Sequence, residues 1–257
     1  MTDPSYAPAA KTTPDMELLG LPMNRAGLTE VHAFIRQVIT RGEKAIALNL
    51  NVHCINLALK HAWLYEFIKQ AQLVFCDGDG VRWALKLRGY SPPPKITYNQ
   101  WLWPLAEFCV QNGFSLFFLG AQPGIAAEAA ENLKKRYPAL QIAGIHHGHF
   151  QKAGAENEAV VSQINQARPD ILLTCFGMPA QEKWIAENWQ RVRAHVFLKG
   201  GAAFDYASGR LAKAPEWMIR LQMEWLFRFF QDPLRLFGRY ILGNPYFFYR
   251  VFKGKNK

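Results

Sequence analysis

Between about residues 44 and 200 the chain repeats one pattern, in which a short apolar run is followed by an amphipathic segment. Continuous apolar runs indicate strands that are buried on both faces, and helices between them connect such strands as parallel neighbours. The pattern therefore predicts an α/β fold with a Rossmann-like, doubly wound and mostly parallel sheet, whose ligands lie outside the carboxyl ends of the strands. The strands are expected at 45–50, 73–76, 115–119, 141–145, 170–175 and 196–198, and the helices near 52–70, 79–89, 99–112, 124–136, 155–167 and 180–191.

The start of the chain differs from this repeating region in composition. Residues 1–16 are rich in Pro, Ala and Thr without an apolar run, which predicts a flexible leader followed by a catalytic domain over 17–209. The leader lacks the basic start and apolar stretch of a secretory signal, and no stretch reaches the roughly 18 apolar residues of a spanning helix. Four widely spaced cysteines without a CxxC pair are typical of a reducing compartment. The expected location is the cytoplasm.

Residues 210–257 hold most of the excess positive charge. Ten of them are basic and three are acidic, in a chain whose net charge is +10. This asymmetry indicates an anionic partner, which is a membrane surface, a nucleic acid or a phosphate-bearing substrate. Residues 215–231 are predicted to form one helix whose narrow polar stripe repeats every four residues and whose remaining surface is apolar. Such a helix is either buried on two sides or docked on the domain with one side in contact with lipid.

The residues after this helix interleave Phe and Tyr with Arg and Lys, which is the composition of an interfacial segment. A wide aliphatic surface gains nothing against phosphates, so the tail favours a membrane over a nucleic acid. We therefore expect a helical C-terminal appendage that associates with the anionic inner face of the cell membrane. Arg235 and Arg239 are expected on its membrane-facing surface.

Asp77 is the principal candidate for a catalytic group. It opens the turn Asp-Gly-Asp-Gly at 77–80, which follows a strand and begins a helix at the sheet edge where active sites form. One carboxylate at this position is suited to general-base catalysis. Two carboxylates separated by one residue also resemble a DxD motif, which holds a divalent metal ion against a nucleotide diphosphate. The structural alternative is that Asp79 only caps the following helix.

Other turns supply candidate substrate contacts. Gly120 and Gly124 flank a strand-to-helix turn where a backbone can approach a phosphate, although any α/β protein needs such turns. Gln181 and Glu182 begin a helix and are suited to a uracil edge, a ribose or a phosphate, with capping as the alternative. The His-His-Gly-His run at 146–149 does not have the spacing of a zinc site and indicates a neutral histidine near a phosphate.

In this order the motifs resemble glycosyltransferase family 26, the WecG/TagA/CpsF group of bacterial enzymes, over about residues 18–240. The segments that carry the resemblance are 49–51, 77–81, 119–124, 145–150, 169–171, 177–184, 200–205, 214–217 and 224–225.

The resemblance implies an inverting hexosyltransferase that moves a sugar from a UDP-sugar to an undecaprenyl-diphosphate-linked sugar in cell-surface or exopolysaccharide synthesis. It implies that Asp77 is the base and that no metal or other cofactor is needed. Asp79 departs from the family, which leaves the question of Mg²⁺ or Mn²⁺ open. Asn49 replaces a typical Thr, and a typical Thr-Gly-Thr/Ser-Asp stretch reads Thr97-Tyr98-Asn99-Gln100. Both departures lie near the expected sugar pocket, so the donor need not carry N-acetylmannosamine.

The expected site therefore combines a base, substrate contacts and two arginines of the appendage that stabilise the leaving UDP. Tying those arginines to a membrane helix would delay full activity until the lipid acceptor is present. The alternative from another class is a nicotinamide-dependent oxidoreductase, although the chain lacks G-x-G-x-x-G after its first strand. The base is Asp77, and the substrate contacts are Asn49, Asn51, Gly78, Thr97, Gly120, Gly124, Gln181, Glu182, Arg220 and Arg228.

Overall fold

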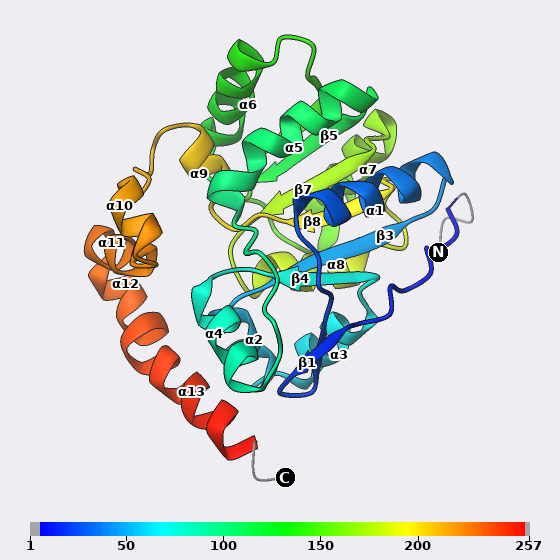
Figure 1. Ribbon diagram of the computed structural model, residues 1–257. Helices are drawn as coiled ribbons and strands as arrows, with labels where there is room; N and C mark the ends of the chain where they lie inside the picture. Colours follow the sequence, from blue (N-terminus) through cyan, green and yellow to red (C-terminus); the bar gives the residue numbers. More distant parts are fainter. Residues whose placement is uncertain (1–5, 255–257) are drawn as a thin grey trace.

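A computed structural model describes residues 6–254 and contains a six-stranded sheet. The sheet lies at the centre with helices on both of its faces (Figure 1). All six strands are parallel and lie in the order β4-β3-β8-β7-β5-β6, which confirms the predicted fold class. The two strands of this sheet that come first in the chain, β3 and β4, form one side of it, and the four later strands form the other side. The strands are β3 (Ala45–Leu50), β4 (Leu73–Cys76), β5 (Ser115–Gly120), β6 (Gln141–His146), β7 (Ile171–Cys175) and β8 (Val196–Lys199).

Alternate side chains of these strands enter two separate cores, which explains why the strands read as continuous apolar runs. One core is formed with α1 (Leu28–Thr40), α5 (Tyr98–Asn112), α6 (Ile125–Arg136) and α9 (Ala203–Ala207). The opposite core is formed with α2 (Val52–Ala58), α3 (Ala62–Gln70), α4 (Asp79–Leu87), α7 (Gly154–Ala167), α8 (Ala180–Asn188), α13 (Gly243–Lys253) and the hairpin of β1 (Met16–Leu18) and β2 (Leu21–Met23).

The N-terminal part of the chain differs from the prediction. The helix expected over 52–70 is two helices, and α1 and the hairpin were not predicted. Residues 1–5 of the expected leader lie outside the described residues. Residues 7–12 hydrogen-bond to the domain rather than forming a free leader, since Ala9 N donates to Lys44 O and Thr12 N donates to Gln72 O.

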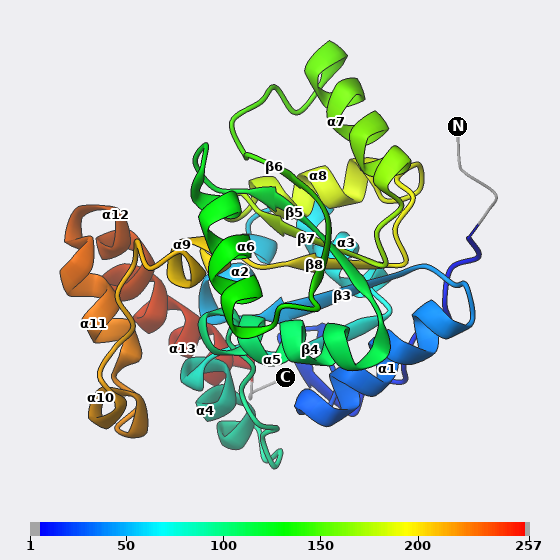
Figure 2. The same cartoon turned by 90° about the horizontal axis from the view of Figure 1, so that it is seen from above.

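The C-terminal segment forms four short helices and one π-helical turn along the side of the molecule that lies away from α1 (Figure 2). The single helix predicted over 215–231 is wrong, because a Schellman motif ends its first part. Gln222 adopts a left-handed conformation with φ of 60°, and Met223 N donates to Met218 O. No helix within residues 6–254 combines the length and apolarity needed to cross a membrane. The elements are α10 (Glu216–Arg220), α11 (Glu224–Gln231), α12 (Pro233–Phe237), η1 (Gly238–Leu242) and α13.

Candidate functional site

A pocket of about 730 Å³ opens at the carboxyl ends of the strands, where β3 and β8 lie side by side. The chain passes from β3 to α2 on one face of the sheet and from β8 to α9 on the other face, so this is the topological switch point where α/β sheets bind ligands. One wall comes from the turns after β3 and β4, and another comes from α11, α12 and η1. The sheet and the C-terminal segment therefore build the pocket together.

Asp77 lies on the pocket wall directly after β4, and two amides fix its carboxylate. Asn49 Nδ2 donates to Asp77 Oδ2 at 2.8 Å, and Asn51 Nδ2 donates to the same oxygen at 3.0 Å. Asn51 is itself held, because its Oδ1 accepts from Cys54 N as the N-cap of α2. Both hydrogen bonds from the asparagine side chains end on Oδ2, so Oδ1 is the oxygen that remains available to the pocket. This arrangement orients a carboxylate without neutralising it.

Several polar atoms beside Asp77 are buried without a hydrogen-bond partner among the described residues. They are Asn49 Oδ1, Thr97 Oγ1 and Tyr98 Oη, and all three residues line the pocket. Burial raises the pKa of Tyr98 well above its usual value, so its hydroxyl remains a donor at neutral pH. Buried polar groups are normally paired, and these three are therefore suited to a ligand that carries hydroxyl or amide groups.

Asp79 is not a partner of Asp77 in the structure. Its two carboxylate oxygens form ion pairs, one with Lys95 at 2.6 Å and the other with Arg82 at 3.3 Å. The N-cap of α4 is Gly78 and Asp79 is the first residue of the helix, so the interpretation of Asp79 as the cap is wrong. In the part of the chain that the structure describes, no three His, Cys, Asp or Glu side chains are grouped to hold a metal ion.

The three predicted glycines are explained by backbone geometry and do not lie on the pocket wall. Gly78 and Gly124 have positive φ values of 93° and 88°, which favour glycine at these turns. A Cβ at Gly120 would lie 2.5 Å from Cys175 O, so β5 and β7 need a glycine there to approach each other. Ala121 and Gln122 of the same turn, which were not predicted, do line the pocket.

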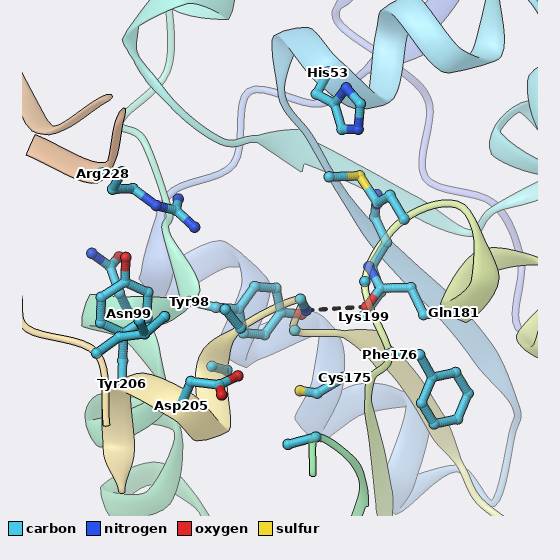
Figure 3. A pocket seen from close by; sticks show the side chains of 18 of the residues that line it. His53, Tyr98, Asn99, Cys175, Phe176, Gln181, Lys199, Asp205, Tyr206 and Arg228 are labelled. Carbon is cyan, nitrogen blue, oxygen red and sulfur yellow. Dashed lines mark hydrogen bonds between the residues drawn. The ribbon is translucent and has the colours of Figure 1, made fainter. Parts of the chain in front are cut away.

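The two predicted residues of α8 have different environments. Gln181 lines the pocket, and its Oε1 accepts from Gly201 N at 3.1 Å. Glu182 is completely buried and pairs with Lys199 Nζ at 2.9 Å, so it is not a direct substrate contact. Burial lowers the pKa of Lys199, but the adjacent charges, including that of Glu182, outweigh it and raise the pKa above its usual value. Figure 3 shows Gln181 and Lys199 on one side of the pocket.

The arginines of the C-terminal segment divide into two groups. Arg228 lines the pocket, with its guanidinium 5.5 Å from the ring centre of Tyr206, and lies near Asn99 in Figure 3. Arg235 and Arg239 also line it, although Arg235 is largely exposed and pairs with Asp232. Arg220 is exposed and pairs with Glu216 at 3.4 Å, so the structure does not bring it to the site. The break between α10 and α11 separates Arg220 from Arg228.

The positive charges of this wall act on a histidine of the opposite wall. His53 on α2 lines the pocket, and burial together with the charges of Arg239 and Lys199 lowers its pKa to about 4. It is therefore neutral at pH 7. A bound anion would offset the same charges.

Two residues of the site were not predicted from the sequence. Lys199 had one signal, which was a charged residue at the end of an otherwise apolar strand. Asn99 lines the pocket, and its Nδ2 donates to Glu224 of α11. Nothing in the sequence pairs these two residues, because 125 positions separate them.

A family model and similar proteins both identify this chain as similar to glycosyltransferases. The model of the "Glycosyl transferase WecG/TagA/CpsF family" matches residues 16–257. Similar proteins include the N-acetylglucosaminyldiphosphoundecaprenol N-acetyl-beta-D-mannosaminyltransferases of Staphylococcus aureus strains MW2, MRSA252 and NCTC 8325. Each is 29% identical over 207 residues, which cover 80% of this chain and 79% of the relative.

Proposed function

The chain belongs to the WecG/TagA/CpsF family of glycosyltransferases, and from this premise we propose that it transfers a hexose from a UDP-sugar to an undecaprenyl-diphosphate-linked sugar. The observation that carries the proposal is the carboxylate of Asp77, which two amides orient at a pocket with unpartnered polar atoms. The printed names of the relatives supply the class of acceptor. Family membership does not support the oxidoreductase alternative.

In the proposed mechanism Asp77 takes the proton of the attacking hydroxyl of the acceptor sugar. The oxygen of that hydroxyl forms a bond with the anomeric carbon of the donor while the bond from that carbon to UDP breaks. The configuration at the anomeric carbon inverts, and the electron pair of the broken bond leaves with UDP. Asn49 and Asn51 hold Asp77 Oδ2, so Oδ1 faces the proton that is transferred.

The leaving UDP carries negative charge, and the C-terminal wall supplies the opposite charge. Arg228, Arg235 and Arg239 line the pocket, and Arg239 Nε is buried without a hydrogen-bond partner among the described residues. Guanidinium groups bind phosphate oxygens with two parallel hydrogen bonds, which strengthens the interaction as charge develops. We assign the diphosphate to these arginines. We do not extend the assignment to Arg220.

We further propose that the C-terminal segment places the enzyme on the anionic inner face of the membrane, where the lipid-linked acceptor resides. Its support is the exposed apolar surface of α10–α12, where Phe230 is 70% and Leu234 is 93% exposed. Basic side chains accompany these residues along the segment. Apolar side chains with basic neighbours are typical of segments that bind at a membrane interface. Docking on the membrane would then bring the acceptor close to Arg228, Arg235 and Arg239.

The proposal predicts catalysis without a metal ion, because both oxygens of Asp79 are paired with Lys95 and Arg82. EDTA should therefore leave transfer intact. Loss of transfer with EDTA and its return with Mg²⁺ or Mn²⁺ would support the DxD interpretation.

The central experiment measures UDP release from a panel of UDP-sugars with a polyprenyl-diphosphate-linked sugar as acceptor. Asp77→Asn should lower kcat by about 10² to 10⁴, the usual contribution of a general base, while UDP affinity and melting temperature stay close to wild type. Asp79→Asn is the matched control, since it lies two residues away and should affect turnover far less. Near-wild-type turnover of Asp77→Asn would remove Asp77 from the mechanism.

A further inference from the structure

A buried ion pair lies at the pocket wall, where Lys199 reaches the lining and Glu182 lies behind it. The pair has no role in the mechanism above. Lys199 is 1% exposed and Glu182 is completely buried, and their charged atoms are 2.9 Å apart. Lys199 Nζ also lies 3.1 Å from Cys54 Sγ, and Glu182 Oε2 has no hydrogen-bond partner among the described residues. Removing two charges from water is costly, so a pair of this kind is weak evidence for stability alone.

The pair links three segments that build the pocket. Glu182 Oε1 accepts from Gln181 Nε2 at 3.2 Å, and Gln181 in turn holds the β8–α9 turn through Gly201 N. Lys199 connects this side to α2 through Cys54. The backbone amide of Cys54 is the group that holds Asn51, and Asn51 holds Asp77. The contacts therefore run from α8, across the switch point between β8 and β3, to the carboxylate of Asp77.

We propose that Lys199 and Glu182 are positioning residues, which fix the distance between the Asp77 side and the Gln181 side of the pocket. The inference rests on the proposed function, since it assigns the two residues to the same transfer reaction. Asp77 and Gln181 lie on different halves of the sheet, so a link across the switch point holds the two sides of the pocket at a fixed distance. A misplacement of about 1 Å can lower a catalytic rate by about 10²-fold.

The first test removes the charges without removing the volume. The double variant Lys199→Met with Glu182→Gln leaves no unpaired buried charge and keeps an acceptor for Gln181 Nε2. Replacing a buried pair in this way is often neutral for stability, so the melting temperature should stay close to wild type. We expect kcat to fall by about 10- to 100-fold, while calorimetric titration gives a UDP affinity close to the wild-type value. The matched control is Glu158→Gln with Arg191→Met, which neutralises a partly exposed pair outside the pocket and should leave kcat unchanged.

The second test addresses the link to α2 alone. Cys54→Ala removes the sulfur that Lys199 contacts and leaves the ion pair intact, so it should lower kcat more than it changes UDP affinity. Cys54→Ser restores an acceptor at the same place and should recover most of the lost rate. A purely structural role would give both variants the same kcat once each is shown to be folded.

The outcomes separate this proposal from the function on which it rests. Without transfer by the wild-type enzyme under any donor and acceptor combination, the proposed function itself fails. If the wild type is active, and the double variant and Cys54→Ala keep its kcat, the pair only fills space and the positioning proposal is wrong. If the double variant does not fold, the two Cys54 variants decide the question, because they retain both charges.

Discussion

Residues 16–209 and residues 210–254 use their large apolar side chains in opposite ways. In the first region the sheet and its helices enclose these side chains in two cores. The exposed ones there are Leu28, Trp63, Trp83 and Leu87. In the second region α11 buries no residue at all, and the exposed apolar side chains are Trp217, Leu221, Trp225, Phe230, Leu234, Phe237, Ile241, Leu242, Tyr246, Tyr249 and Phe252. Apolar surface on this scale is characteristic of a site that binds another surface.

The comparison also shows that the C-terminal segment is not uniform. Phe247 and Val251 of α13 are completely buried in the same core as α2 and α4, and Asn56 Nδ2 donates to Gly243 O at 2.7 Å. Helix α13 therefore anchors the segment. Helices α10–α12 bury only Met218 and Leu236 and make polar contacts with the domain, such as the hydrogen bond from Trp83 Nε1 to Gln222 Oε1 at 2.8 Å. Contact with the core and the proposed contact with a membrane can thus be altered separately.

The largest expected effect concerns the anchor. Phe247→Ala should lower the free energy of unfolding by about 3–5 kcal/mol, because it leaves a cavity in the core. Phe252→Ala lies on the same helix but is 53% exposed, and should change the free energy by less than about 0.5 kcal/mol. Urea unfolding measures both. Equal costs would mean that α13 is not part of the core.

The second effect separates the arginines within the C-terminal segment. Arg228→Gln should lower kcat/KM by about 10²- to 10³-fold, the usual loss when one group that stabilises transition-state charge is removed. Arg220 is exposed and belongs to α10, so Arg220→Gln should stay close to wild type. Steady-state kinetics with the preferred UDP-sugar compares the two. A similar loss in both variants would contradict the division of the arginines by the pocket.

The third effect tests the exposed face. The triple variant Phe230→Ser, Leu234→Ser and Leu242→Ser should weaken binding to anionic liposomes by at least about tenfold, since partitioning follows the apolar area that is buried. Its melting temperature and UDP affinity should remain close to wild type. The control is Trp63→Ser, an exposed apolar residue of α3 in the first region. Unchanged liposome binding of the triple variant would remove the membrane role from this face.

The smallest expected effect concerns the charge of Arg239 in the C-terminal segment and the pKa of His53 in the first region. Arg239→Gln should raise the pKa of His53 from about 4 toward its ordinary value of 6.5, because it removes a positive charge that opposes protonation. His32, whose pKa burial and Arg36 lower to about 4, is the control and should not move. NMR titration of the histidine rings follows both. An unshifted His53 would show that Arg239 does not act on this wall.

The lowered pKa values of His32 and His53 also make the free energy of unfolding depend on pH. As the pH falls from about 6.5 toward 4, the unfolded chain binds protons that the folded histidines do not, so the free energy of unfolding decreases. For His32 the contact is specific, because Trp101 Nε1 donates to its Nε2 at 2.8 Å and protonation would remove this acceptor. His32→Gln should therefore reduce the dependence of the melting temperature on pH in this window. An unchanged dependence would exclude His32 as its cause.

The sequence by itself determined the sheet and the position of Asp77. Every predicted strand is present, because burial on both faces makes a strand apolar at every position, and that pattern is local. Asp77 follows directly from the end of one such strand. The glycines at 78, 120 and 124 were recognised as turn residues, but whether they reach a ligand depends on neighbours that local sequence does not specify.

Only the tertiary structure decided which side chains meet. Asn49 and Asp77 are 28 positions apart, and Lys199 and Glu182 are 17 apart, yet each pair is in contact because parallel connections bring strand ends to one edge of the sheet. The break at Gln222 gave no glycine signal, and it moved Arg220 away from the pocket while Arg228 stayed. Helical spacing places residues relative to their own helix axis, whereas the contacts of a residue depend on where the whole chain packs that helix.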